Sequence, residues 1–250
     1  MNRPSKIQYV INQNDNLYQL SRYYQTTVPE ILTLNPNIDP YDLQAGSSIT
    51  ICPGDQFVST SCDSNPPACP NPIIQRNLYS SMLQAWLQHA YWTRLLLVST
   101  TNTLDDEGDT MSRALRNPAD ITKVFTTYYS PATVNIIEQL LAEHMRIESE
   151  LITAMRDDQS AESEALSKRW HQNADQMAET FSNINPFYNT EDVRDMIYEH
   201  LRLSIHEIEM HLSNDYEASI EAFTEVEQSI IKISHYFSSG IISQFPQKFM

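Results

Sequence analysis

Four polar side chains in the second part of the chain occur where large apolar residues recur at helical spacing. They are His89, His144, Asn173 and His200. Each has apolar residues three or four positions away, so a helix would turn it toward the buried face. Imidazoles and an amide gathered inside a helical bundle can hold a divalent metal ion, or they can form a hydrogen-bonded network that fixes helix pairing.

Acidic residues accompany these positions. Glu143 and Glu199 directly precede two of the histidines, and Asp175 lies two positions after Asn173. They are candidate metal ligands, or groups that orient the ligands. However, the Glu-x-x-His spacing of di-iron carboxylate bundles is absent, and neighbouring residues on a helix point about 100° apart. We therefore favour the polar network and keep the metal or small-ligand site as the alternative.

An internal echo suggests how the four positions meet. Leu141–Ile147 (LAEHMRI) parallels Ile197–Leu203 (IYEHLRL), and each follows a joint rich in aromatic residues. This pattern predicts two similar helical hairpins. Packed with pseudo-twofold symmetry, the hairpins would bring the three histidines and Asn173 together near the bundle axis.

The elements that carry these residues follow from a 3.6-residue period. We expect helices at about 74–100, 118–128, 131–157, 159–183, 190–213 and 215–243. The boundaries coincide with Asn117-Pro118, Ser130-Pro131 and Asn185-Pro186, because the residue before a proline disfavours helix. Only 4 glycines occur in 250 residues. Long helices with short connections predict an all-α bundle.

The first part of the chain has a different pattern. Short strands are expected at 8–11 and 48–51, with two short helices between them at about 17–24 and 27–34. Residues 54–73 are rich in Pro, Ser, Asn and Asp, which sustain neither a helix nor a ladder. The predicted organisation is therefore α+β: a small βααβ module at 1–53, a linker at 54–73 that contains Pro and Cys, and an acidic helical bundle at 74–250.

Residues 7–53 resemble the lysin-motif (LysM) family. The family usually has Gly-Asp-Thr/Ser-Leu where this chain has Asn14-Asp15-Asn16-Leu17, and Asn tolerates the positive φ that such a turn requires. The matching segments are Tyr9-Val10-Ile11, Asn14–Tyr18, Thr26–Leu32, Leu34-Asn35-Pro36, Leu43–Gly46 and Ile49-Thr50-Ile51.

The resemblance implies that this module binds N-acetylglucosamine-containing polymers such as peptidoglycan. It places the sugar in a shallow groove between the first turn and the loop after the second helix. A single copy implies weak binding that gains from repetition. The implied groove residues are Asn14, Asp15, Asn16, Leu17, Asn35, Pro36, Asn37 and Ile38.

Residues 76–249 resemble a family of helical proteins from spore-forming Gram-positive bacteria. The shared features are the Glu-His helices, Trp170-x-x-Asn173-Ala174-Asp175 and Gln244-Phe245-Pro246-x-x-Phe249. Members are sometimes labelled acetylglutamate kinases. The sequence argues against that activity, because only Gly108 and Gly240 follow the linker and no glycine-rich phosphate loop exists there.

Charge and cysteine content limit the partners. The net charge is -16, and residues after 53 carry 28 acidic and 13 basic side chains. This excess disfavours nucleic acid and anionic membranes as partners. Cys52, Cys62 and Cys69 have no metal-binding spacing, so free thiols, one bridge, or disulfide-linked or self-assembled protein partners stay open. We expect no Sec signal peptide and no membrane span.

The combined prediction is a non-enzymatic protein that binds peptidoglycan or another GlcNAc polymer. The resemblances favour a structural role at the spore coat or cortex, or otherwise at the cell wall. The alternative is a metal-binding or enzymatic helical bundle held at the wall by its module. A glycosidase with paired carboxylates also stays open, since acidic residues are plentiful.

Overall fold

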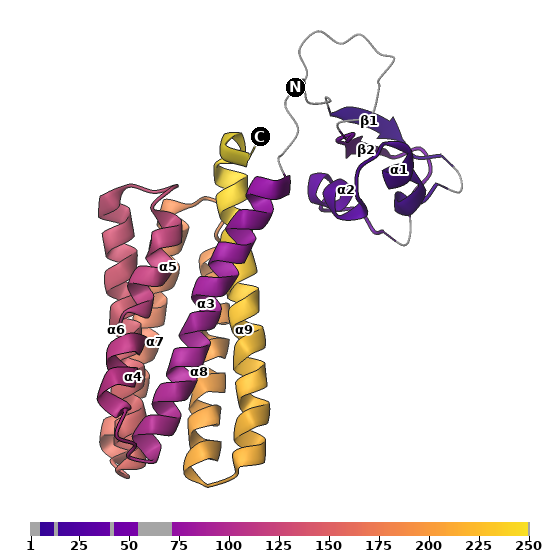
Figure 1. The fold of residues 1–250 in the computed structure, drawn as a ribbon. Helices are drawn as coiled ribbons and strands as arrows, with labels where there is room; N and C mark the ends of the chain where they lie inside the picture. Colours follow the sequence, from indigo (N-terminus) through magenta and orange to yellow (C-terminus); the bar gives the residue numbers. More distant parts are fainter. Residues whose placement is uncertain (1–5, 13–14, 41–42, 55–71, 250) are drawn as a thin grey trace. The chain divides into compact units, whose positions relative to one another are not determined.

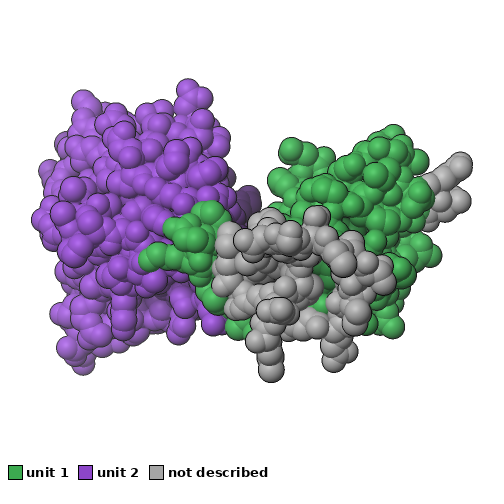
Figure 2. Space-filling view, turned by 90° about the horizontal axis from the view of Figure 1, so that it is seen from above, with its two compact units in different colours: residues 1–75, 246–250 green, residues 76–245 purple. Residues whose placement is uncertain are grey.

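The chain folds into two compact units. The computed structural model describes residues 6–12, 15–40, 43–54 and 72–249. One unit comprises residues 1–75 and 246–250, and the other comprises residues 76–245, as coloured in Figure 2. The predicted fold class is confirmed: a small β/α module precedes a helical body. Most of the predicted linker, residues 55–71 with Cys62 and Cys69, lies outside the described residues, whereas Cys52 is disulfide-bonded.

The first unit contains a two-stranded sheet with two helices inserted between its strands (Figure 1). The strands pair antiparallel, with Ile7 opposite Ile51 and Val10 opposite Ser48. The elements are β1 (Ile7–Val10), α1 (Leu17–Tyr23), α2 (Val28–Leu34) and β2 (Ser48–Ile51).

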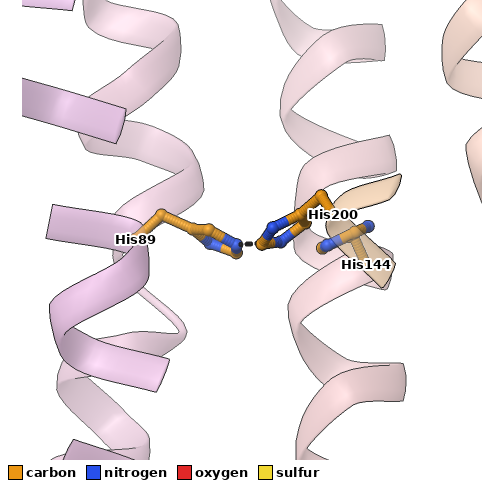
Figure 3. Close-up of side chains that lie close together, drawn as sticks. All are labelled: His89, His144 and His200. Carbon is orange, nitrogen blue, oxygen red and sulfur yellow. Dashed lines mark hydrogen bonds between the residues drawn. The ribbon is translucent and has the colours of Figure 1, made fainter. Parts of the chain in front are cut away.

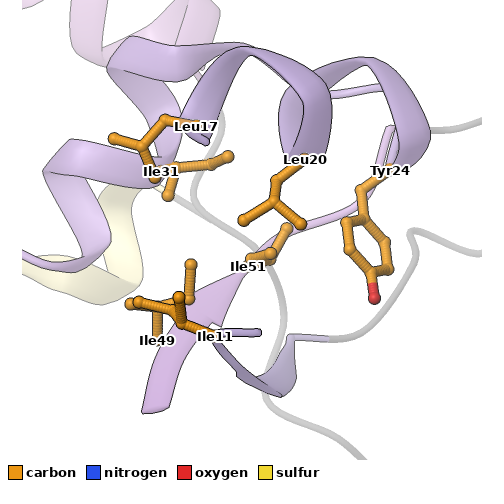
Figure 4. Close-up of a cluster of buried hydrophobic side chains, with 7 residues drawn as sticks. All are labelled: Ile11, Leu17, Leu20, Tyr24, Ile31, Ile49 and Ile51. Carbon is orange, nitrogen blue, oxygen red and sulfur yellow. The ribbon is translucent and has the colours of Figure 1, made fainter. Parts of the chain in front are cut away.

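Short polar residues fix where the two helices begin. The Asn16 side chain accepts a hydrogen bond from the backbone N–H of Gln19 at the start of α1. Thr27 and Glu30 form a reciprocal capping box at the start of α2. With their starts fixed, both helices turn apolar residues onto the sheet. The core shown in Figure 4 consists of Ile11, Leu17, Leu20, Tyr24, Ile31, Ile49 and Ile51.

The helical unit contains the six predicted long and short helices, each within about one turn of its expected bounds. A short 3-10 helix, η1 (Pro246–Phe249), follows the last of them. The helices are α3 (Pro72–Thr101), α5 (Asn117–Phe125), α6 (Pro131–Arg156), α7 (Ser160–Ile184), α8 (Thr190–Leu212) and α9 (Tyr216–Gln244).

One further helix, α4 (Glu107–Ala114), was not predicted. Its sequence, EGDTMSRA, holds too few apolar residues for a recognisable period. Tertiary contacts stabilise it instead: Arg113 forms an ion pair with Asp120 and lies 4.8 Å from the ring centre of Trp92. These contacts attach α4 to α3 and α5.

Helices α6 and α7, α7 and α8, and α8 and α9 pack directly on each other, and α5 packs on α6 (Figure 1). Helix α3 reaches the others through side chains. The Trp86 ring stacks on Phe237 of α9 at 5.8 Å between ring centres. About two turns further along α3, Arg94 pairs with Glu207 of α8 at 2.8 Å. No helix among the described residues has the length and apolar character needed to cross a membrane.

Candidate functional site

Three histidines from three helices meet inside the helical unit. His89 lies on α3, His144 on α6 and His200 on α8, and all three are buried. Figure 3 shows the rings facing one another, with Nε2 of His89 3.1 Å from Nε2 of His200. One nitrogen from each ring lies within 4.8 Å of the others. No carboxylate or thiolate joins this group in the part of the chain that the structure describes.

Neighbouring side chains orient two of the rings. The Nε1–H of Trp170 donates to Nδ1 of His144 at 3.1 Å. Nδ1 of His200 lies 3.4 Å from the Ser229 hydroxyl. Asn173 on α7 lies beside His144 and favours the charged form of that ring. The structure thus brings all four predicted residues into one region of the bundle.

The surroundings keep the imidazoles neutral. Burial, and then the charge of His200, lower the pKa of His144 to about 3. Burial lowers the pKa of His200 to about 4. Burial and the charges of the other two histidines also lower the pKa of His89 well below its ordinary value. At neutral pH the rings therefore carry lone pairs rather than positive charge.

The acidic residues expected near the histidines lie elsewhere. Glu143 forms ion pairs with Arg146 and Arg169, and Glu199 pairs with Arg202 at 2.8 Å. Asp175 likewise pairs with Arg194 and accepts a bond from Tyr198. The reason is helical geometry: the residue before an inward-facing histidine points about 100° away from it. None of the three carboxylates is brought to the histidine group.

A second polar group lies further along the same helices. Glu148 is four residues after His144 and only 3% exposed, and its Oε2 has no hydrogen-bond partner among the described residues. Burial and then the charge of Glu207 raise the pKa of Glu148 to about 8. Glu207 is held by Arg94, whose guanidinium also donates to Ser219. Of the two buried acidic residues, Glu207 is therefore paired with an arginine, whereas Oε2 of Glu148 has no partner in the described structure.

A small cavity adjoins the histidines. It has a volume of about 10 Å³ and is lined by all three rings, together with Trp86 and Asn117. That volume is roughly what one water-sized sphere occupies. Within the described residues, the Nε1–H of Trp86 and Oδ1 of Asn117 are buried without a hydrogen-bond partner. One hydrogen-bond donor and one hydrogen-bond acceptor on residues that line the cavity therefore have no partner in the described structure.

Several of these residues were not singled out from the sequence. Trp170, Ser229, Trp86 and Asn117 contact the site from other helices, and their roles depend on how the helices are rotated. Glu148 gave a signal, since it falls on the same apolar stripe as His144. A buried acid on an apolar stripe is unusual, and this spacing is the signal from which a second polar layer could have been predicted.

The side chains of the predicted glycan groove fall into two groups: some form internal hydrogen bonds or belong to the core, and others are exposed to solvent. Asn14 lies outside the described residues. The Asp15 carboxylate accepts hydrogen bonds from the Tyr9 hydroxyl and the Asn12 N–H, both at 2.7 Å. Asn16 caps α1, and Leu17, which is 3% exposed, belongs to the core. These side chains build the first turn rather than a free surface.

On the other side, Asn35 is also internally engaged. Its amide nitrogen donates to the carbonyls of Ile31 and Thr50, and its Oδ1 accepts from the Thr50 N–H. These bonds tie the end of α2 to β2. The following Pro36 and Asn37 are exposed, and Ile38 is half-buried against the core. The freely presented groove side chains are therefore Pro36 and Asn37, whereas Asn16 is exposed but uses its Oδ1 to cap α1.

The geometry of the first unit defines a class: a two-stranded antiparallel sheet covered by two short helices, with exposed polar groups at the loops. Comparison with known families assigns it: residues 9–51 match the LysM domain. A LysM domain indicates binding to peptidoglycan or other GlcNAc-containing polymers. Searches of curated proteins and of solved structures found no match to the chain.

Proposed function

We propose that the protein binds peptidoglycan, or a related GlcNAc-containing polymer, through its first unit and thereby holds its helical unit at that polymer. The observation that carries this proposal is the LysM match at residues 9–51. The contacts within the unit support it, because the sheet, both helices and their caps are complete and enclose a core of their own.

The proposed binding surface is the exposed edge formed by the first turn and the loop after α2. Asn37 and Asn16 offer amide and backbone groups for the acetamido substituent of the sugar. Pro36 and Ile38 offer apolar surface for its methyl group and ring face. Asp15 and Asn35 act indirectly, since their side chains hold the two loops in place.

Binding by one such surface is weak, so the polymer itself contributes. A polymer repeats the same sugar many times, and a dissociated domain meets the next unit at high local concentration. One LysM domain therefore suits an anchor that keeps the acidic helical unit near the polymer while allowing exchange along it.

Sedimentation of the full chain with insoluble peptidoglycan tests the proposal. We expect retention that soluble GlcNAc oligomers compete away, and no retention on cellulose. Replacing both Pro36 and Asn37 by Ala removes exposed side chains that make no hydrogen bond within the described structure. Retention should fall about fivefold, which corresponds to the loss of roughly 1 kcal/mol. Asn102→Ala, an exposed asparagine of the helical unit, is the matched control. Failure of the wild-type chain to sediment would overturn the proposal.

The setting that we propose is the spore cortex or coat, or otherwise the cell wall. The resemblance of residues 76–249 to helical proteins of spore-forming bacteria supports the spore, as does the disulfide at Cys52, since such bonds persist in oxidising surroundings. A fluorescent fusion followed during sporulation of the source organism tests this. A signal confined to vegetative walls would favour the wall, and a diffuse signal throughout would contradict both settings.

A second function, metal binding by the helical unit, is favoured by the convergence of His89, His144 and His200. It is compatible with glycan binding, because the residues concerned belong to different units. The two functions can therefore be lost separately, and each variant described for one serves as a control for the other.

A further inference from the structure

The geometry points to a site for one transition-metal ion of the Zn²⁺ class, bound by His89, His144 and His200, with a fourth coordination position open to water or a small anion. The inference goes beyond glycan binding and rests on the metal function proposed for the helical unit. It assigns the ligands, the kind of ion and the occupant of the remaining position.

The ring positions approach those that a tetrahedral site requires. Zinc–nitrogen distances of about 2.0–2.1 Å place two ligand nitrogens about 3.4 Å apart. His89 and His200 already satisfy this, with 3.1 Å between their Nε2 atoms. The widest separation in the group is 4.8 Å. The remaining approach of roughly 1.5 Å is within reach of ring and side-chain rotation.

In two of the three rings, those of His200 and His144, a neighbouring group can accept a hydrogen bond from the nitrogen that does not bind the ion. The Ser229 hydroxyl donates to the Val226 carbonyl, so its lone pairs can accept from Nδ1–H of His200 and leave Nε2 for the ion. His144 must turn, because Trp170 now donates to its Nδ1. Oδ1 of Asn173, buried and unpartnered among the described groups, is the acceptor for the N–H of the turned ring.

The cavity supplies the fourth position. Water bound to a metal accepts one hydrogen bond and donates others. At the cavity, the unused Nε1–H of Trp86 can donate to such an oxygen, and the unused Oδ1 of Asn117 can accept from it. The Asn117 Nδ2 is occupied by the Ala85 carbonyl at 3.1 Å, which leaves Oδ1 directed elsewhere. One small polar occupant would satisfy both groups, and the volume admits only one.

The ligand set selects the class of ion. Three neutral imidazoles suit Zn²⁺, Co²⁺, Ni²⁺ and Cu²⁺, whereas Ca²⁺ and Mg²⁺ require oxygen ligands that this group lacks in the described structure. We take Zn²⁺ as the occupant and Co²⁺ as its spectroscopic substitute. Three protein ligands with one open position is the arrangement of zinc sites that activate water, whereas purely structural sites are closed by four protein ligands.

The charge of the ion also has a counterpart in the fold. Glu148 lies on the same face of α6 as His144, about 6 Å further along the helix axis. Its buried Oε2 has no partner in the described structure. Burial raises the pKa of Glu148 to about 8, so this carboxyl is protonated at neutral pH in the metal-free protein. Loss of its proton on metal binding would place a negative charge near the buried dication and lower the cost of burying it.

Titration of the full chain, freed of metal with a chelator, tests the site. We expect one equivalent of Zn²⁺ per chain, a higher melting temperature with metal, and the strong visible absorption of tetrahedral Co²⁺. His200→Ala should weaken binding at least about 100-fold. His206→Ala on the same helix is the matched control and should bind normally. Peptidoglycan retention should be unchanged in both variants. If wild-type protein binds no metal, or if His200→Ala binds as well as wild type, both the metal function and this inference are overturned.

The open position has its own readout. Fluoride, a single-atom anion of about the size of water, added to the Co²⁺ form should change the visible spectrum, and Trp86→Phe should weaken fluoride binding about tenfold by removing one donor. His206→Ala should respond to fluoride as wild type does. A Co²⁺ spectrum that is tetrahedral yet insensitive to fluoride would overturn the open position while leaving metal binding by the histidines intact.

Discussion

Replacement of Asn35 by Ala separates a groove residue that contacts sugar from one that only positions the groove. The Asn35 amide makes three hydrogen bonds, two of them to the backbone of Thr50 in β2 and one to Ile31 in α2. Its side chain therefore closes the first unit. We expect Asn35→Ala to reduce retention on peptidoglycan by destabilising this unit, without removing a contact to the sugar.

The magnitude follows from these bonds. Each hydrogen bond contributes about 1 kcal/mol net, so three lost bonds destabilise the unit by about 3 kcal/mol. A domain of some 45 residues has a total stability of roughly 2–7 kcal/mol. The loss therefore removes a large share of the available stability, and a substantial unfolded population results. The helical unit has its own core and should be unaffected.

Hydrogen exchange measured by mass spectrometry on the full chain tests this expectation. Peptides covering α2 and β2 should exchange rapidly in Asn35→Ala, while those covering α6 to α9 keep their protection. The Pro36/Asn37 double alanine variant should lose retention with normal protection. If Asn35→Ala keeps its protection but still loses retention, Asn35 contacts the sugar and the reasoning from its internal bonds is refuted.

Two further predictions concern the helical unit. Glu148→Gln should change how stability depends on pH: the folded pKa of Glu148 is about 8 against an ordinary 4.5, so the native acidic pair retains a proton that the unfolded chain has lost. Stability from this group is present at low pH and declines as pH rises, so from pH 5.5 to 7.5 the wild type should lose about 3 kcal/mol relative to the variant. Urea unfolding of both proteins at both pH values measures this change in the free energy of unfolding. The contribution of the histidines is the same in both proteins and cancels when they are compared. An equal change with pH in the wild type and in Glu148→Gln would contradict the prediction. Gly240→Ala should destabilise by about 1–3 kcal/mol, because a Cβ there would lie 1.9 Å from Cε1 of the buried Tyr188 ring. Gly108→Ala, with nothing within 4 Å, is the control for thermal melting, and equal melting temperatures for the two variants would show that Tyr188 yields freely.

Local signals account for the parts of the fold that the sequence predicted well. The short helices expected at about 17–24 and 27–34 are present, because their starts depend on the capping side chains of Asn16 and Thr27, which bond within three residues of their own positions. The long helices α6 to α9 were predicted because their apolar period persists over many turns. Helix α4 was missed, since its stability depends on contacts such as the one between Arg113 and Trp92.

The features that the sequence did not predict depend on contacts between residues that are far apart in the chain. The internal role of Asn35 depends on Thr50, which pairing of the strands brings to it. The cavity beside the histidines depends on α3 and α5 presenting Trp86 and Asn117 to the same space. No pattern within one helix determines such a meeting, because it requires the rotation and height of both helices.

The repeated segments Glu143–Arg146 and Glu199–Arg202 allow the outward-facing ion pairs to be compared with the inward-facing histidines for their effect on stability. In both segments the Glu faces outward and pairs with the Arg three residues later, while the intervening His faces inward. These exposed pairs contribute little to stability because solvent screens them, and any soluble helix can carry them. The buried imidazoles are different, since burying polar groups without full hydrogen bonding costs free energy that leucine at the same positions would not. Stability alone therefore favours apolar residues at His144 and His200. In the proposed metal site, an ion bound by these rings and His89 would supply the missing favourable interaction, so we expect the metal-loaded protein to be more stable than the metal-free protein.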